Sequence, residues 1–536
     1  MTEVRRQRLA RLFLPGLPAL ALLVALLAAV PAMASEFFGH HQLGARGARV
    51  MTSGQAAASH AQGMTDLTTE VPAPGGDPST AGSGHVGEAA FWIALATLAG
   101  VYVLIAFDII HRTLAALLGA ALVLSVSYTA GTFWPDYFIM SFQDATAAID
   151  WNVIFLLLGM MIIVGILKES GLFHWLAFKG LQSARGNAYL LVIVLMALTA
   201  LLSALLDNVT TMLLLTPVAI DICQVLGLHP FAVLMPCVLA SNFGGTATLI
   251  GDPPNIMIGS SAGLTFNDFL SNLGPLVVIT LIAQGVVMRF YYGRQYRAAT
   301  MTFASEEPVK KGKVRRRKMP QGLESRFAVS DYRLLVLGLA ILALVVGLFV
   351  AHGTLHMEVS IAALLGAALL ALLSGADIVR LLQEDVEWPT LVFFMMLFVV
   401  VGAAERVGLL KIVADWITLT SSGNLVAAIL IVAWASAIIS AIIDNIPFTA
   451  TMLPVVAYLT RTIPGAENMV LWYALALGAC FGGNATLIGA SANVVTADLL
   501  AKAGHPVSFR YFLKVGFPVM VLGMVLGSLW LVLVLR

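Results

Sequence analysis

Two aspartate–asparagine pairs interrupt apolar segments of this chain. Asp207 and Asn208 lie between the stretches ALLSALL and VTTMLLL, and Asp444 and Asn445 divide a second apolar segment in the same way. An aspartate at bilayer depth costs about 2.5 to 3.5 kcal/mol on insertion scales, so it needs water, a cation or a polar partner. Asp and Asn also favour helix N-caps, but a serine cap would not supply an ionisable carboxylate. The pairs therefore predict a transport role with H+ or Na+ as coupling ion.

A second pair of motifs also interrupts apolar sequence. FGGTATLIGDPPN at 243–255 and FGGNATLIGASAN at 481–493 share nine of thirteen residues. Glycine and proline weaken or end a helix. An unwound segment leaves carbonyls free for a cation and presents a helix N-terminus to an anion. The halves are chemically unequal, because Asp252 of the first motif aligns with Ala490 of the second.

The elements around these motifs are predicted to be transmembrane helices. Hydrophobic residues make up 59% of the 536 residues, charged residues 11%, and mean hydropathy is +0.92, whereas a soluble domain carries about 25% charge. Apolar runs long enough to cross about 30 Å of hydrocarbon occur at about 89–107, 113–130, 151–167, 229–260, 273–292, 332–351, 357–374, 388–404, 468–500 and 511–535. Longer, interrupted segments lie at 188–224 and 424–460.

The two sets of runs are copies of each other. AALLGAAL occurs at 115–122 and at 362–369, and the segments from Asp150 and Glu387 align without gaps. If each interrupted segment enters and leaves on one side, each copy crosses the membrane five times and the copies are inverted, a common transporter plan. We therefore expect an all-α polytopic membrane protein with two inverted repeats, each of five spans plus a re-entrant hairpin, and a discontinuous helix in each half.

The remaining segments give the expected domain boundaries. Residues 1–34 are typical of a signal peptide or N-terminal anchor, and 35–88 of a disordered extracytoplasmic tail. Transport repeats are expected at 89–293 and 331–536, joined by a basic linker at 294–330 that the positive-inside rule places in the cytoplasm rather than on nucleic acid. The same rule places Arg112, Lys168, Lys179, Arg185, Arg380, Lys502 and Arg510 inside and leaves Arg406, Lys411 and Arg461 outside. The predicted location is the inner (plasma) membrane.

The motifs LLDNVTTMLLLTPV at 205–218 and GGTATLIGDPPN at 244–255 resemble the ion transporter superfamily of citrate transporter-like permeases. They look most like its ArsB-like and P-protein-like branch. The resemblance covers about 89–536 and implies two re-entrant hairpins whose tips meet unwound helices near the membrane centre, often in a homodimer. Carboxylate carriers of this superfamily typically have Ser-Asn-Thr at the tips, whereas this chain has Asp207-Asn208-Val209 and Asp444-Asn445-Ile446.

The resemblance also carries site roles to matching positions. It implies that the inward-side tip contains Asp207, Asn208 and Thr210, and that Asp444 and Asn445 lie opposite. The implied ligands on the unwound helices are Gly244, Gly245, Thr248, Asn255, Gly482, Gly483, Asn484, Thr486 and Asn493; Asp252 joins this candidate set. No metal-binding residues are assigned, and the hairpin tips are the candidate sites for Na+. No cofactor is expected.

These features favour a secondary active transporter for an inorganic ion or oxyanion, with arsenite- or antimonite-type efflux first. The two aspartates disfavour a polyanion unless cations neutralise them. A Na+/H+ antiporter and a sodium-coupled di- or tricarboxylate symporter are the alternatives, and a passive channel is a third class. An intramembrane aspartyl protease is disfavoured because AII rather than GxG precedes Asp444. No phosphate-loop motif is present, so ATP drive would need a separate ATPase subunit. Cys223, Cys237 and Cys480 are expected to be core residues.

Overall fold

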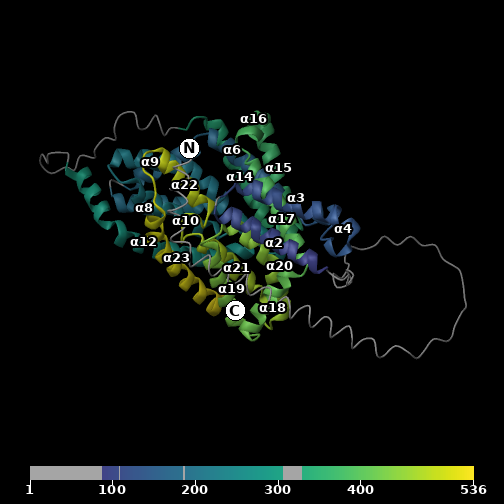
Figure 1. The fold of residues 1–536 in the computed structure, drawn as a ribbon. Helices are drawn as coiled ribbons and strands as arrows, with labels where there is room; N and C mark the ends of the chain where they lie inside the picture. The colour runs from purple at the N-terminus through teal and green to yellow at the C-terminus, as the bar shows by residue number, and fades with distance from the viewer. Residues whose placement is uncertain (1–86, 108, 185–186, 306–328) are drawn as a thin grey trace, which may run out of the picture. The chain divides into compact units, whose positions relative to one another are not determined.

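The computed structural model describes residues 87–107, 109–184, 187–305 and 329–536. The predicted signal or anchor at 1–34, nearly all of the predicted tail and most of the basic linker lie outside these residues. Residues Ala89–Arg536 form one compact unit. Its described part is helical throughout and contains no β-strand (Figure 1), which confirms the expected all-α class.

The first half of this unit ends in a long helix. Its elements are α2 (Glu88–Ala106), α3 (Arg112–Tyr128), α4 (Ala130–Phe133), η2 (Pro135–Tyr137), α5 (Phe142–Ala147), α6 (Trp151–Glu169), α7 (Leu172–Ser183), α8 (Ala188–Leu205), α9 (Asn208–Leu226), α10 (Pro230–Gly245), α11 (Pro253–Ala262) and α12 (Phe266–Ser305). Helix α12 passes the expected domain boundary at 293/294. The first residues of the predicted linker are therefore helical.

The second half repeats this order of major helices. Its elements are α14 (Tyr332–Leu355), α15 (Val359–Ser374), α16 (Ile378–Glu384), α17 (Trp388–Arg406), α18 (Leu409–Ser421), α19 (Leu425–Ser440), α20 (Asn445–Thr462), η3 (Ala466–Asn468), α21 (Val470–Gly482), α22 (Ser491–Lys502), α23 (Phe509–Trp530) and η4 (Leu531–Leu535). The internal sequence match thus corresponds to a repeated succession of helices. The inversion of the repeats relative to a membrane stays a prediction.

Equivalent residues begin and end equivalent helices. Asn187 and Asn424 cap α8 and α19 by accepting hydrogen bonds from first-turn N–H groups, and such a cap contributes about 1 kcal/mol. The aligned residues Gly171 and Gly408 precede α7 and α18 with φ of 80° and 79°. Glycine adopts this left-handed conformation without a side-chain penalty. The copies therefore share their turn chemistry as well as their apolar runs.

The motifs found in the sequence break the helices where expected. Between α8 and α9 the chain leaves the helix at Leu206 and Asp207, and between α19 and α20 it does so over 441–444. We call residues 206–208 the first tip and 441–445 the second tip. The stretches 246–252 and 483–490, which separate α10 from α11 and α21 from α22, are called the first and second breaks. The discontinuous helix predicted in each half is confirmed.

The two halves interlock rather than pack as separate bodies. Helix α6 packs on α15, while its counterpart α17 packs on α3, and Figure 1 shows α3 and α17 side by side. The same exchange occurs near the motifs, where α9 packs on α22 and α20 on α11. Each tip helix therefore contacts the helix that follows the other half's break.

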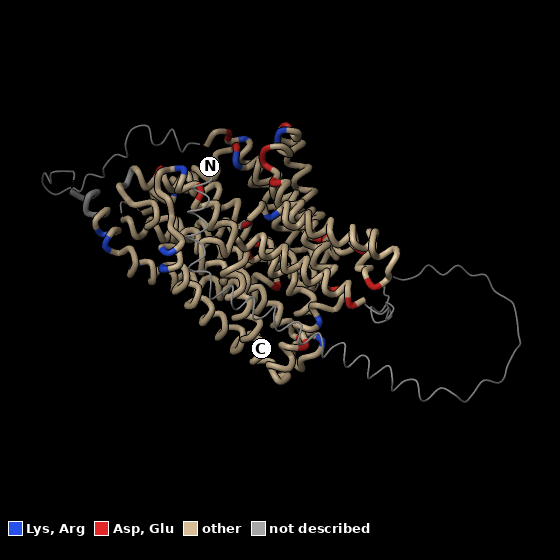
Figure 2. The backbone as a smooth tube through the Cα atoms, viewed as in Figure 1, with Lys and Arg blue, Asp and Glu red and all other residues tan. Residues whose placement is uncertain are grey.

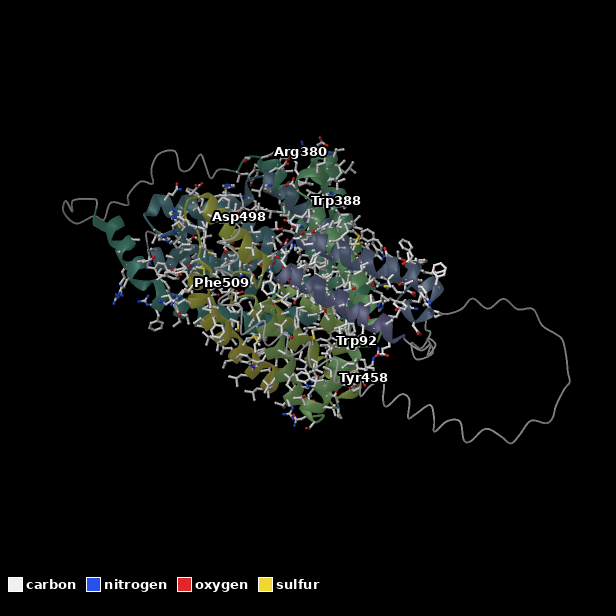
Figure 3. All side chains as sticks on the ribbon, in the orientation of Figure 1. Trp92, Arg380, Trp388, Tyr458, Asp498 and Phe509 are labelled. Carbon is white, nitrogen blue, oxygen red and sulfur yellow. The ribbon has the colours of Figure 1, made fainter. Side chains whose placement is uncertain are left out.

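Eight helices of the described residues are long and apolar enough to cross a membrane. Of the ten predicted spans, α15 is shorter than a full span, and the runs at 229–260 and 468–500 are divided into shorter helices by their breaks. Charged residues gather mainly near the ends of the helical body (Figure 2). Arg380 lies at the opposite end of the body from Trp92 and Tyr458 (Figure 3).

Candidate ion-binding site

Asp252 lies at the meeting point of both tips. It precedes α11 and is 1% exposed. Asn208 Nδ2 of the first tip donates to Asp252 Oδ2 at 3.1 Å. Asn445 Nδ2 of the second tip lies 3.3 Å from Oδ1 and 3.2 Å from Oδ2 of the same carboxylate. The residue that distinguishes the two breaks is therefore the one that joins the two hairpin tips.

An asparagine not singled out in the sequence connects this cluster to the second break. Asn242 of α10 is fully buried and accepts a hydrogen bond from Asn208 Nδ2 at 3.3 Å. Its own Nδ2 donates to Asn484 Oδ1 and Asn493 Oδ1, both at 3.0 Å. The sequence feature that could have identified Asn242 is its amide side chain, which lies in a largely apolar segment just before the glycine pair.

The carbonyl groups of both breaks are already hydrogen-bonded. Asn255 Nδ2 donates to the carbonyl oxygens of Gly245 and Thr248 at 3.0 and 2.8 Å. Asn493 Nδ2 makes the equivalent bonds to Gly483 and Thr486, both at 2.8 Å. Each of these four carbonyl oxygens therefore already accepts one hydrogen bond within the protein, as a buried backbone carbonyl requires, and their role as cation ligands stays a prediction. The side chains of Asn255 and Asn493 therefore stabilise the backbone conformation of the two breaks.

The two threonines expected as ligands attach the first break to the end of α8 and the second break to the second tip. Thr248 Oγ1 donates to the Ala204 carbonyl at 2.5 Å, and Thr486 Oγ1 donates to the Ala441 carbonyl at 2.5 Å. Thr248 Oγ1 also accepts a hydrogen bond from Gly251 N at 3.1 Å. In this structure both hydroxyl protons are used within the protein, so these side chains position the tips.

The glycine pairs serve close packing between helices. A Cβ on Gly244 would collide with the backbone of Ala200 in α8, and one on Gly482 would collide with Ala437 in α19. A Cβ on Gly245 would lie 2.6 Å from the Gly251 carbonyl oxygen. These contacts explain why both copies carry two adjacent glycines: the helix before each break packs directly on the helix before each tip.

Asp207 has a different environment from Asp252. Its Oδ1 accepts a hydrogen bond from Thr210 N at 2.7 Å, which caps α9. The side chain is half-buried, and the described residues supply no lysine or arginine within ion-pair distance of it. The predicted capping role is present, and Thr210 contributes its backbone N–H.

Asp444 at the second tip forms an ion pair. Its Oδ2 lies 3.1 Å from Arg112 Nη1 and accepts a hydrogen bond from Ser491 Oγ at 2.7 Å. The Arg112 and Asp444 side chains are 25% and 13% exposed. Arg112, expected on topological grounds to be a cytoplasmic residue, therefore contacts the candidate site.

Asp207 and Asp444 immediately precede the two asparagines that contact Asp252. The amides of Asn208 and Asn445 both donate to the Asp252 carboxylate, so each tip carries one further acid next in the chain to its contact residue. In the described residues no group of three His, Cys, Asp or Glu side chains has the arrangement of a metal site.

One donor next to the centre is unsatisfied. Asn484 is fully buried, and within the described ranges its Nδ2 has no hydrogen-bond partner. Nearby, the buried Cys480 thiol lies 3.6 Å from Asn255 Oδ1, so this cysteine belongs to the core as predicted and also borders the site. Asn484 Nδ2 is thus a buried donor without a protein acceptor among the described residues.

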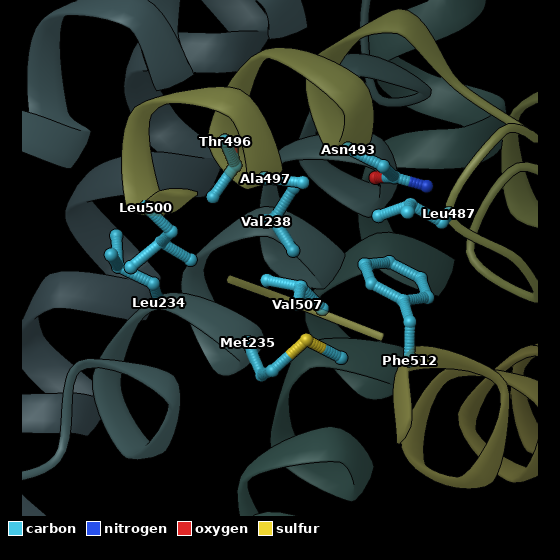
Figure 4. Close-up of a pocket in the computed structure, with 10 residues that line it drawn as sticks. All are labelled: Leu234, Met235, Val238, Leu487, Asn493, Thr496, Ala497, Leu500, Val507 and Phe512. Atoms are coloured by element: carbon cyan, nitrogen blue, oxygen red, sulfur yellow. The ribbon is translucent and has the colours of Figure 1, made fainter. Parts of the chain in front are cut away.

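A small pocket borders the amide cluster between α10 and α22. Figure 4 shows Asn493 at its edge, with Leu234, Val238 and Phe512 among the apolar lining residues. Its volume of about 10 Å³ is near the limit for one water molecule. The pocket is therefore too small for a substrate in this conformation.

The helical fold and the broken helices around a buried carboxylate define a multi-span membrane transporter. The profile of the family described as "Citrate transporter" (CitMHS) matches residues 102–478. The chain belongs to this citrate transporter family, within the ion transporter superfamily.

Proteins of several organisms are similar to this chain. An uncharacterized transporter of Mycobacterium tuberculosis is 43% identical over 442 residues, which cover 82% of this chain and 97% of the relative. The P protein of Mus musculus is 35% identical over 506 residues, covering 82% of this chain and 60% of the P protein. These relatives confirm the predicted P-protein-like resemblance and a transporter rather than an enzyme.

One solved structure shows a similar fold. The YdaH transporter of Alcanivorax borkumensis superposes with a TM-score of 0.50 and 16% sequence identity, covering 79% of this chain and 98% of that one. At this identity the likeness concerns the fold alone. The arrangement of helices described above is therefore also found in a solved transporter.

Proposed function

We propose that this protein is a secondary active transporter that moves a small inorganic ion or oxyanion across the inner membrane, coupled to H+ or Na+. Arsenite- or antimonite-type efflux is the favoured activity. The observation that carries the proposal is the Asp252 carboxylate, buried between the amides of Asn208 and Asn445.

Coupling follows from the cost of burying this carboxylate. A buried carboxylate without a compensating charge is costly at bilayer depth, and the described residues provide no ion pair to Asp252. A bound proton or Na+ removes that cost. Because both tips contact the same carboxylate, binding or release of the ion changes the contacts of both hairpins together. This is the linkage that coupled transport requires.

The partners around the carboxylate favour a neutral or weakly charged substrate. Asn242 and Asn484 continue the amide chain that begins with Asn208 at Asp252, and Asn484 Nδ2, which has no partner among the described residues, is a ready donor. A neutral hydroxide such as arsenite both donates and accepts hydrogen bonds, so it suits this set without a cluster of cations. A substrate of the arsenite class is therefore favoured over a polyanion.

A di- or tricarboxylate is the second candidate substrate. It is supported by the family's description as citrate transporters and by Arg112 beside Asp444, which places one guanidinium at the second tip. Neutralisation of the tip carboxylates by Na+ would be needed for such a polyanion. Pure Na+/H+ exchange is the remaining alternative, since it needs only the carboxylates.

We further propose that the basic linker is cytoplasmic and the N-terminal segment lies outside. The separation of Arg380 from Trp92 and Tyr458 (Figure 3) supports this orientation, because the positive-inside rule places Arg380 inside and the predicted tail places Trp92 near the outer end. We also propose a homodimer, on the ground of the family resemblance. Because the sequence contains no phosphate-loop motif, any use of ATP would require a separate ATPase subunit.

The test is a flux panel on purified full-length protein in liposomes with imposed pH and Na+ gradients. Arsenite, antimonite and citrate are offered in turn, and Na+/H+ exchange is followed with a pH-sensitive dye. We expect gradient-driven arsenite or antimonite movement that stops when the gradient is collapsed. Movement of citrate alone, or of no offered solute while Na+/H+ exchange proceeds, would replace the favoured activity by one of the alternatives.

A further inference from the structure

The two tips carry equivalent carboxylates with unequal partners. Asp207 and Asp444 occupy the same position in the aligned segments SALLDN and SAIIDN. Asp444 is paired with Arg112 at 3.1 Å. Asp207 accepts a hydrogen bond from Thr210 N and has no ion-pair partner within the ranges that the structure describes. One of two matched acids is therefore neutralised by the protein itself.

The Arg112 guanidinium is held from several directions. Nη1 donates to Asp444 Oδ2 at 3.1 Å and to Ser491 Oγ at 2.7 Å, and Nη2 donates to Thr390 Oγ1 at 3.2 Å. The guanidinium carbon also lies 5.4 Å from the centre of the Phe393 ring, within the range of a cation–π interaction. These contacts come from the second tip, α17 and α22, so the charge is fixed at this position.

The aligned positions of the chain do not repeat this arrangement for the first tip. In the alignment of AALLGAAL at 115–122 with 362–369, Arg112 corresponds to Val359, and in the alignment from Asp150 and Glu387, Thr390 corresponds to Val153. At the places equivalent to this contact, the second half therefore has Val359 instead of the cation, and the first half has Val153 instead of the threonine. The two repeats therefore differ in sequence at both the arginine and the threonine of this contact.

We infer that Arg112 is a built-in counter-ion for Asp444 and occupies, at the second tip, the place that a coupling cation takes at the first. The positive charge that other ions would bring to Asp444 is supplied permanently by α3. Coupling is then confined to Asp207 and Asp252. This consequence rests on the proposed ion-coupled function, whereas the counter-ion role itself is testable without transport.

The inference predicts that removal of Arg112 creates a cation requirement. Loss of one partner leaves a largely buried charge uncompensated, which is destabilising. In Arg112→Ala the vacated space lies between a carboxylate and two hydroxyl groups, a set of oxygen ligands suited to guanidinium or Na+. Either ion should then stabilise the folded protein by binding to it and not to the unfolded chain.

The experiment measures thermal unfolding of the full-length protein in detergent, with NaCl, choline chloride or guanidinium chloride at millimolar concentration. We expect Arg112→Ala to unfold a few degrees below the wild type and to regain most of that loss with guanidinium or Na+ but not with choline. Arg406→Ala is the matched control, because Arg406 forms an ion pair with Asp144 at 2.6 Å outside the site. It should show no such recovery.

The double variant Arg112→Gln/Asp444→Asn keeps the test decisive if Arg112→Ala does not fold. With both charges removed, it should be more stable than Asp444→Asn alone and should not respond to added cations. A single variant that responds equally to choline would overturn the inference. So would an equal cation response in the double variant, because the ion would then act elsewhere. Neither result bears on whether the protein transports arsenite.

Discussion

Asn445 Nδ2 and Asp252 Oδ2 lie 3.2 Å apart although 193 positions separate them in the chain. The contact joins the second tip to the first break, and Asn208 makes the matching contact from the first tip at 3.1 Å. The halves thus share one acid at their centre. Chemical inequality between the repeats, rather than their similarity, places this buried acid, because Asp252 aligns with Ala490.

The contacts of Asn208 and Asn445 with Asp252 should contribute about equally to the free energy of unfolding. We expect Asn208→Ala and Asn445→Ala each to destabilise the protein by about 1–3 kcal/mol, because each leaves the buried Asp252 with one donor fewer. Changing either residue to Asp should cost more, since two carboxylates would then face each other. Thermal unfolding of the four variants checks this order. An aspartate variant as stable as its alanine counterpart would speak against the contact.

The glycines before the breaks should be intolerant of a methyl group. We expect Gly244→Ala and Gly482→Ala each to lower the free energy of unfolding by about 1–3 kcal/mol, because the new Cβ meets the α8 or α19 backbone. Gly347→Ala is the matched control: a Cβ there meets nothing within 4 Å, and alanine is the better helix former. Equal melting temperatures for Gly244→Ala and Gly347→Ala would show that α8 and α10 are not closely packed.

Asp144 should make stability depend on pH below neutrality. A hydrogen bond from Ser141 and the ion pair with Arg406 lower the pKa of Asp144 from 3.8 to about 2. Because its pKa is lower in the folded state, its contribution is fully present above about pH 4 and is lost as pH falls toward 2. Between pH 5 and pH 3 the melting temperature of Asp144→Asn should therefore fall less than that of the wild type. The difference should correspond to the uptake of about one proton on unfolding of the wild type. Parallel curves would contradict the assignment.

Much of the fold could be predicted from local pattern. Apolar runs gave the long helices to within a few residues, and the glycine, proline and aspartate positions gave the tips and breaks, because these residues act on their own backbone. Helix α12 extended beyond the apolar run at 273–292, since helical hydrogen bonding continues into polar sequence. The amphipathic helices α7 and α18 were not singled out because they are too short and polar to resemble a span.

The partners within the site could not be predicted in the same way. Arg112 reads as an ordinary positive-inside residue at the start of a span, and its contact with Asp444 depends on the packing of α3 against α17 across more than 300 positions. Likewise, spacing singled out the threonines and carbonyls of the breaks as ligands, but tertiary packing gave them protein partners. Only the contacts across the two halves show that Asp252 is central.

The most direct test of the account is gradient-driven accumulation by Asp252→Asn in liposomes, with the solute that the flux panel identifies. We predict a loss of more than about tenfold relative to the wild type, equivalent to about 1.4 kcal/mol, in protein that remains folded. Asp498→Asn is the control, because Asp498 is exposed and forms an ion pair with Lys502 of its own helix, away from the site. Wild-type accumulation by Asp252→Asn under the same pH and Na+ gradients would contradict the central claim.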